Sequence, residues 1–132
     1  MTIQTDSSAP PTSELHEKCD NANASRAPSA YCLFIDDERE PVRADYLVVR
    51  SSAAAIETVL QRGMPVDISF DHDLGGDDTT MRFLLWLTDQ LLDEKLQFPG
   101  GFCFSVHSQN PVGARNIKER MQSLLAHFPP LP

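Results

Sequence analysis

The chain has no excess of basic residues. Its 132 residues include 11 Lys and Arg against 19 Asp and Glu, which gives a formal net charge of −8. Non-specific binding to nucleic acid requires a cationic face that displaces counterions, so the composition argues against extended nucleic-acid binding. A small phosphorylated ligand or an RNA end is still compatible, because an acidic protein can hold a local cationic site. The length predicts one folded domain.

Long apolar runs and metal-binding cysteine patterns are also missing. No stretch approaches the roughly 18 apolar residues of a membrane span, and the first residues form no apolar segment of signal-peptide type. The three cysteines, Cys19, Cys32 and Cys103, show no C-x-x-C spacing. Two of them fall in predicted buried strands, where a free cysteine behaves as a small apolar residue. We therefore expect no membrane association and a reduced, cytoplasmic setting.

Large apolar side chains are scarce at the start of the chain. Residues 1–30 are rich in Ser, Thr, Pro, Ala and Asn, a composition that cannot bury enough surface to offset chain entropy. We interpret residues 1–30 as a disordered N-terminal tail and residues 31–128 as the folded domain. Residues 129–132 are expected to form a short C-terminal tail.

The folded part alternates short apolar runs with amphipathic segments. Strands are predicted over 31–35, 46–50, 66–70 and 102–106. Strands that alternate with helices pair in parallel through right-handed crossovers. The pattern predicts a small three-layer α/β domain with a short parallel sheet of about four strands.

Three helices are predicted between and after these strands. The first begins at Ser51 or Ser52 and ends at Gly63, a residue suited to the position after a helix. The second spans about 79–94 and follows a loop that ends in the N-cap residues Asp77 and Asp78. Asn110 as N-cap with Pro111 at the first helical position begins the last. The expected inner face of the second helix comprises Met81, Leu84, Leu85, Leu91 and Leu92, and Phe83, Trp86 and Leu87 widen it.

Three polar clusters directly follow apolar runs. The carboxyl ends of parallel strands lie side by side, and ligands bind in the crevice outside them. We therefore expect the clusters to form one site with the side chains needed for phosphate chemistry. The clusters are Asp36-Asp37-Glu38-Arg39, Asp71-His72-Asp73 and His107-Ser108-Gln109-Asn110-Pro111.

The acidic side chains and the histidines predict two kinds of chemistry. Carboxylates such as Asp36, Asp37 and Asp71 are ligands that Mg²⁺ prefers. A histidine beside carboxylates, as His72 is beside Asp71 and Asp73, is oriented for acid–base work near neutral pH. His107 is expected at the rim of an anion pocket, where it would exchange a proton with a phosphate ester oxygen.

Four further residues are candidates for phosphate binding. Ser108 and Asn110 stand at the start of the last helix, whose free N–H groups and positive dipole end bind anions. Arg39 and Arg50 can each bind two oxygens of a phosphate through the guanidinium group. An ion pair with a neighbouring acid is an equal alternative for either arginine.

Taken together, these motifs resemble two related families. The acidic residues resemble the pocket of response-regulator receiver domains, in which a strand-end Asp accepts a phosphoryl group. The whole set is similar to the cyclic-phosphate processing receiver domain family, over about residues 31–121. The matching segments are Leu33-Phe-Ile-Asp-Asp-Glu-Arg39-Glu-Pro41, Val48-Val-Arg50-Ser51, Ser69-Phe-Asp-His-Asp-Leu-Gly75 and His107-Ser-Gln-Asn-Pro-Val-Gly113.

The resemblance implies a modified receiver-like, flavodoxin-like fold and the processing of cyclic phosphate ends on RNA. Two departures from a true receiver are visible: residues 40–45 are too few for a helix, and no fifth strand with its Lys follows. Both argue against conventional phosphorelay signalling. The site residues that the resemblance implies are Asp36, Asp37, Arg39, Asp71, His72, Asp73, His107, Ser108 and Asn110.

We therefore predict a phosphoesterase that acts on a 2′,3′-cyclic phosphate RNA end or a cyclic nucleotide. His72 and His107 would share the proton transfers, and the phosphoryl oxygens would be stabilised by the arginines and the helix N-terminus. The carboxylates would either orient the imidazoles or hold a divalent cation such as Mg²⁺. Two alternatives stay open: a non-catalytic module that senses a phosphorylated ligand or a protein partner, and a phospho-accepting receiver with Asp71 as acceptor.

Overall fold

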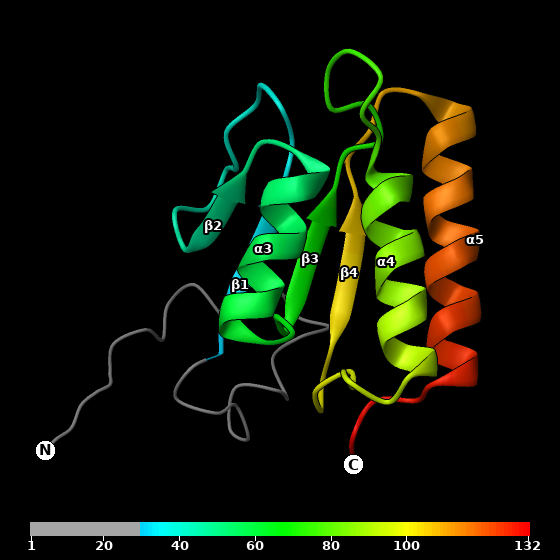
Figure 1. The fold of residues 1–132 in the computed structure, drawn as a ribbon. Coiled ribbons are helices and arrows are strands. Elements are labelled where there is room, and N and C mark those ends of the chain that lie inside the picture. Colours follow the sequence, from blue (N-terminus) through cyan, green and yellow to red (C-terminus); the bar gives the residue numbers. More distant parts are fainter. Residues whose placement is uncertain (1–29) are drawn as a thin grey trace, which may run out of the picture.

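The structure, a computed structural model, describes residues 30–132 (Figure 1). Its sheet has four parallel strands in the order β2-β1-β3-β4, which confirms the predicted α/β class. The tail predicted over residues 1–30 lies outside the described part, apart from Ala30. The strands are β1 (Cys32–Ile35), β2 (Tyr46–Val49), β3 (Asp67–Phe70) and β4 (Cys103–Val106).

The register of the sheet aligns the ends of the strands. Ile35 of β1 pairs with Phe70 of β3, and Phe70 pairs with Val106 of β4. Backbone bonding continues one residue beyond these ends, because the Asp71 N–H donates to Ile35 O at 2.9 Å and the His107 N–H donates to Phe70 O at 2.8 Å. The first residue of each polar cluster is therefore fixed by the sheet itself.

Three helices follow the strands. They are α3 (Ser52–Arg62), α4 (Thr80–Leu92) and α5 (Pro111–His127). Helices α3 and α5 begin at their predicted capping residues, whereas α4 is capped by Thr79. The side chains of Ser51, Thr79 and Asn110 accept hydrogen bonds from the first-turn N–H groups of α3, α4 and α5. Gly63 ends α3 with a φ of +85°, a conformation that glycine adopts at low cost.

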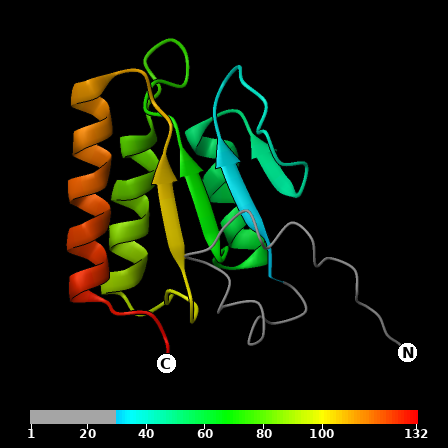
Figure 2. The same cartoon turned by 180° about the vertical axis from the view of Figure 1, so that it is seen from behind.

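The helices lie on one side of the sheet. Figures 1 and 2 show α3 and α4 over one face and α5 along the β4 edge beside α4. The core between them is built by strand residues of one parity, such as Leu33, Ile35, Ile68 and Phe70, none of them exposed. No described helix covers the opposite face, so residues 30–132 do not form the second helical layer of the expected three-layer arrangement.

The buried face of α4 is narrower than the predicted one. Phe83 and Leu87 are fully buried as expected, whereas Leu85 and Leu92 are 56% and 60% exposed. The prediction for Leu85 and Leu92 was wrong because α4 packs against α3 and α5, and these two residues lie on its solvent side.

The remaining sequence predictions concern the segments between elements and the cysteines. No helix lies between β1 and β2, as the short connection predicted, and no described helix is long and apolar enough to cross a membrane. Cys32 is buried and lies outside any disulfide, but Cys103 is disulfide-bonded, so the interpretation of both as cysteines without a disulfide holds only for Cys32. The C-terminal segment packs back onto the domain, because the Leu131 N–H donates to Phe98 O at 3.1 Å.

Candidate functional site

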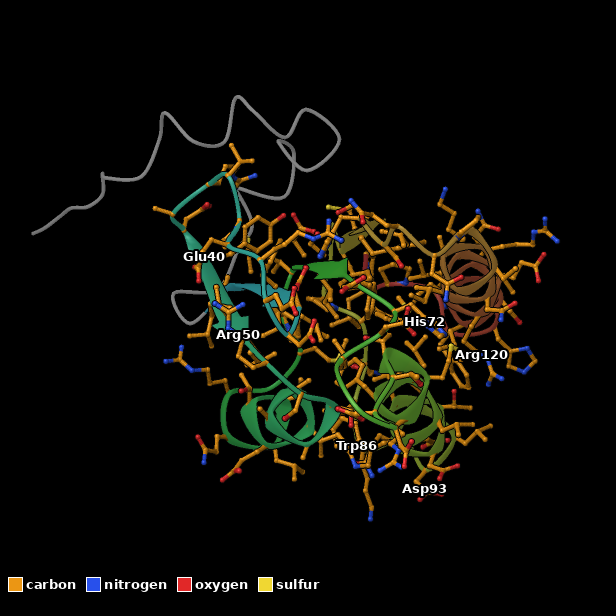
Figure 3. All side chains as sticks on the ribbon, turned by 90° about the horizontal axis from the view of Figure 1, so that it is seen from above. Glu40, Arg50, His72, Trp86, Asp93 and Arg120 are labelled. Atoms are coloured by element: carbon orange, nitrogen blue, oxygen red, sulfur yellow. The ribbon has the colours of Figure 1, made fainter. Side chains whose placement is uncertain are left out.

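A pocket of about 440 Å³ lies at the carboxyl ends of β1, β3 and β4. All three polar clusters contribute to it, and the loop before α4 adds a glycine pair. Figure 3 looks down on this edge, with Glu40 and Arg50 beside β2 and His72 toward α5. The pocket is lined by Asp37, Glu38, Arg39, Asp71, Asp73, Gly75, Gly76, Ser108, Gln109 and Asn110.

Asp36 lies buried next to this pocket. Its side chain is 1% exposed, and its Oδ1 accepts hydrogen bonds from the N–H groups of Glu38 at 2.8 Å and Arg39 at 2.9 Å. Its Oδ2 lies 2.9 Å from His107 Nε2. Burial alone would raise the pKa of Asp36, but the two backbone bonds and the His107 bond outweigh it and lower that pKa. Asp36 is therefore ionised at neutral pH.

Three carboxylates meet closely enough to hold a cation. One oxygen from each of Asp36, Asp37 and Asp71 lies within 4.8 Å of the other two. Asp36 and Asp71 are buried, Asp71 being 7% exposed, and carboxylate oxygens carry further lone pairs beyond the hydrogen bonds they accept here. The donor set and its spacing fit a hard divalent cation such as Mg²⁺.

His107, expected at the rim of the pocket, is not among its lining residues. Its ring stacks on Phe34 with centroids 4.5 Å apart and planes 5° from parallel. Both ring nitrogens are hydrogen-bonded: Nδ1 lies 2.7 Å from Ser69 Oγ, and Nε2 lies 2.9 Å from Asp36 Oδ2. Because the backbone continues the β3–β4 ladder, the ring of His107 extends over the sheet, and both of its nitrogens contact protein side chains.

His72 does not line the pocket either, but it contacts Asp73, which does. Its Nδ1 lies 3.0 Å from Asp73 Oδ1, and the other Asp73 oxygen accepts from Asn110 Nδ2 at 3.2 Å. The His72 bond, followed by the Asn110 bond, lowers the pKa of Asp73. Asp73 thus presents an ionised carboxylate that is held between the end of β3 and the start of α5.

A glycine of α5 makes this contact possible. A Cβ at Gly113 would lie 2.4 Å from Cγ of His72 and 2.7 Å from its Cδ2, far inside van der Waals contact. The side chain of His72 therefore packs closely against the first turn of α5, where only glycine leaves room. Asn110 contributes from the same turn, because its Oδ1 accepts from the Gly113 N–H at 3.0 Å while its Nδ2 binds Asp73. Both ends of that amide are used, so phosphate binding by Asn110 would require it to exchange partners.

The two candidate arginines differ in position. Arg39 lines the pocket, with its Nη1 donating to His107 O at 3.2 Å and its Nε 3.7 Å from Asp36 Oδ2. Arg50 lies outside the pocket and clamps the β1–β2 connection, donating to Asp36 O at 3.1 Å and Arg39 O at 2.7 Å while pairing with Glu40. Both arginines pair with a neighbouring acid, Arg39 with Asp36 and Arg50 with Glu40. Arg39 is left as the phosphate-binding candidate because it also lines the pocket.

Ser108 lies where the helix N-terminus meets the pocket. Its Oγ accepts from the Asn110 N–H at 3.1 Å, and a serine hydroxyl can donate at the same time. Gln109 and Glu38, which belong to the predicted clusters but were given no role of their own, join it in the lining, as do Gly75 and Gly76. The Gly-Gly pair after Asp71-His72-Asp73-Leu74 is the one signal in the sequence that could have identified this wall.

The charge of the lining is uneven. Four acidic residues (Asp37, Glu38, Asp71 and Asp73) face one arginine, Arg39. A bare phosphate would be repelled by such a pocket, because like charges at short range cost free energy when they are shielded from water. A divalent cation held by Asp36, Asp37 and Asp71 would remove that repulsion.

The fold and the site define a receiver-like domain: a parallel sheet ordered β2-β1-β3-β4 with an acidic pocket at its carboxyl edge. A family model for the cyclic-phosphate processing receiver domain matches residues 31–123. The chain therefore belongs to that family. No curated protein and no solved structure matches the chain.

Proposed function

We propose that the pocket binds a cyclic phosphodiester together with a divalent cation and hydrolyses one of its ester bonds. The substrate class is a 2′,3′-cyclic phosphate at an RNA end or a cyclic nucleotide. The observation that carries the proposal is the three-carboxylate cluster of Asp36, Asp37 and Asp71, which opens into a pocket that also presents Arg39 and Ser108. Membership of the cyclic-phosphate processing family supports the same substrate class.

The carboxylates Asp36, Asp37 and Asp71 would hold the cation. When bound, a divalent cation neutralises phosphoryl charge and acidifies bound water. Arg39 then orients a phosphoryl oxygen through its guanidinium, with Asp36 and the His107 carbonyl fixing its position. Ser108 donates a hydrogen bond to a second oxygen from the start of α5, where the helix dipole also favours negative charge.

Proton transfer falls to the Asp73–His72 pair, because Asp73 lines the pocket and His72 is bonded directly to it. The oxygen of water forms a bond to phosphorus as the bond from phosphorus to one ring oxygen breaks. The pair takes a proton from that water and returns one to the departing oxygen. The products are a phosphomonoester and a free hydroxyl, so no further reactant is needed.

Hydrolysis of a 2′,3′-cyclic nucleotide, followed by ³¹P NMR with Mg²⁺ and with EDTA, tests the proposal. We expect turnover with Mg²⁺ only. The rate of hydrolysis should fall by about 10²–10⁴-fold in Asp73→Asn, which is the usual contribution of a general acid–base group. Asp73 is 64% exposed, so the variant should fold normally, and Asp89→Asn on the exposed side of α4 is the matched control. Equal turnover by wild type and Asp73→Asn would contradict the mechanism.

The same protein can be used to test the two alternative functions. Asp71 follows β3 within the acidic cluster, which is the position of a phospho-acceptor, so incubation with acetyl phosphate and intact-mass measurement tests that alternative. A pure binding module would bind the cyclic nucleotide in calorimetry and return it unchanged. Turnover without an added phosphoryl group on the protein supports the esterase.

A further inference from the structure

His107 has the surroundings of a residue that acts through another side chain. We infer that His107 is a positioning residue: with its proton on Nε2 it orients Asp36 for the cation, and it does not exchange protons with the substrate. Its role in ligand binding rests on the proposed function. The contacts of the ring carry the inference in three steps.

The ring of His107 is held by protein side chains. One of its faces is covered by Phe34, which is itself 7% exposed. Its Nδ1 contacts Ser69 and its Nε2 contacts Asp36. A proton-transfer group needs a nitrogen within hydrogen-bond reach of the reacting oxygen, whereas both nitrogens of His107 are bonded to protein groups.

The hydrogen bonds select one tautomer. Ser105 Oγ donates to Ser69 Oγ at 3.3 Å, which leaves the Ser69 hydroxyl free to donate its own hydrogen to His107 Nδ1. Nδ1 then carries a lone pair and Nε2 carries the proton, which it donates to the ionised Asp36. Each group in this chain uses its donor and acceptor once, so the arrangement is fully satisfied.

The hydrogen bond from His107 fixes the orientation of the Asp36 carboxylate. Two backbone N–H groups hold its Oδ1, and His107 is the side chain that fixes its Oδ2. Groups that hydrogen-bond a metal-binding carboxylate typically contribute about 10–100-fold to metal affinity. Asp36 would keep its charge without His107 but lose its set orientation toward Asp37 and Asp71.

Three variants test this in the full chain, with Mn²⁺ affinity as the probe. Glutamine carries an amide nitrogen in place of Nε2 and cannot relay a proton. His107→Gln should therefore bind Mn²⁺ within a few-fold of wild type and retain hydrolysis. His107→Ala should lose about 10–100-fold in Mn²⁺ affinity. If His107→Ala fails to fold, Ser69→Ala, which removes only the donor to Nδ1, should still weaken Mn²⁺ binding.

The tautomer of His107 can be measured independently of the Mn²⁺ affinity. The ¹⁵N chemical shifts of the His107 ring at neutral pH should show the proton on Nε2 in the wild type, because the ionised Asp36 accepts it. Ser69→Ala should shift the Nδ1 resonance, because it removes the hydrogen bond to that nitrogen. A proton on Nδ1 in the wild type, or a Ser69→Ala protein unchanged in both shifts and Mn²⁺ affinity, would overturn the inference.

The outcomes also separate this inference from the proposed function. A wild type that binds Mn²⁺ but hydrolyses nothing refutes the esterase and leaves the role of His107 intact. A His107→Gln variant that binds Mn²⁺ normally yet is as inactive as His107→Ala refutes the positioning role and makes His107 a proton-transfer group. A wild type that binds no Mn²⁺ refutes both.

Discussion

Among single residues, Asp36 shows most directly how the sheet sets the chemistry of the site. A carboxylate that is 1% exposed would ordinarily favour its neutral form, yet three hydrogen bonds reverse that preference. The same bonds contribute to folding. Because the pKa in the folded state lies below the ordinary value of 3.8, this contribution is present above pH 3.8 and is lost as the pH falls through the lowered pKa.

This linkage predicts a pH-dependent effect of Asp36→Asn. The variant should lower the free energy of unfolding at pH 7 by about 1–3 kcal/mol, the usual cost of leaving buried partners unsatisfied. The difference from wild type should shrink as the pH falls below about 4. Urea unfolding across this range measures it, with the exposed Asp89→Asn as control. A difference that stays constant with pH would contradict the assignment.

The positions of the site residues along the chain could be predicted from the sequence, whereas the directions of their side chains could not. Spacing predicted that Asp71, His72 and His107 follow neighbouring strands, and they do. Spacing could not predict that the ring of His107 would turn onto Phe34, or that Arg50 would clamp its own loop. Both depend on side-chain direction and on partners from other strands, which the order of residues along one segment does not encode.

At the scale of elements, two contacts connect the site to the helices. The first is the packing of His72 on Gly113 of α5. Replacing glycine by alanine inside a helix is normally favourable by about 1 kcal/mol, whereas forcing a methyl group into a filled space costs about 1–3 kcal/mol. The steric term should win here, because the new Cβ meets the rigid ring and the Cβ of His72 rather than the end of a flexible side chain.

We therefore expect Gly113→Ala to be destabilised in chemical denaturation, against the helix propensity. The double variant His72→Ala/Gly113→Ala should recover part of the loss, since only the contact with the His72 Cβ remains. Ser123→Ala, at an exposed position of α5, is the control. A Gly113→Ala protein as stable as wild type would show that α5 shifts freely relative to β3.

The second contact joins the loop before α4 to the start of α3. Asp78 Oδ2 accepts from the Ser52 N–H at 2.8 Å, and its other oxygen accepts from the Ser52 hydroxyl. The sequence suggested Asp77 and Asp78 as capping residues of α4, but Thr79 has that role and Asp78 serves α3 instead. A cap supplied from 26 residues away cannot be found from local spacing, whereas Ser51 and Asn110, which cap the helices that follow them directly, were predicted.

The capping role of Asp78 predicts that Asp78→Ala loses about 1 kcal/mol of stability, the typical value for a helix cap. Asp77→Ala, at the exposed neighbouring position, should change little. Urea unfolding of the two variants measures the difference. If the two variants are equally stable, the Ser52–Asp78 contact contributes nothing to folding.

For the whole molecule, the net charge of −8 and the acidic pocket have a common consequence. Closely spaced carboxylates repel one another in the folded state, and a bound divalent cation relieves that repulsion. A ligand that binds only the folded state stabilises it in proportion to the logarithm of its concentration, by about 2.7 kcal/mol at 100 times Kd.

Mg²⁺ should therefore raise the Tm of the wild type by several degrees, and NaCl of equal ionic strength should not. Asp37→Asn should lose most of this increase because it removes one of the three carboxylates, whereas Asp89→Asn should keep it. Differential scanning fluorimetry is sufficient to measure the shifts. Equal shifts with Mg²⁺ and NaCl would point to general screening of charge.

The backbone bonds that extend the sheet past its strands also determine how the site opens to exchange with water. The N–H groups of Asp36, Asp71 and His107 donate to Val49 O, Ile35 O and Phe70 O. Their amide protons should exchange only when the whole domain unfolds, whereas those of the exposed Gly75 and Gly76 should exchange through local opening. The floor of the pocket would thus persist as long as the fold itself, and ligands would enter past the glycine wall.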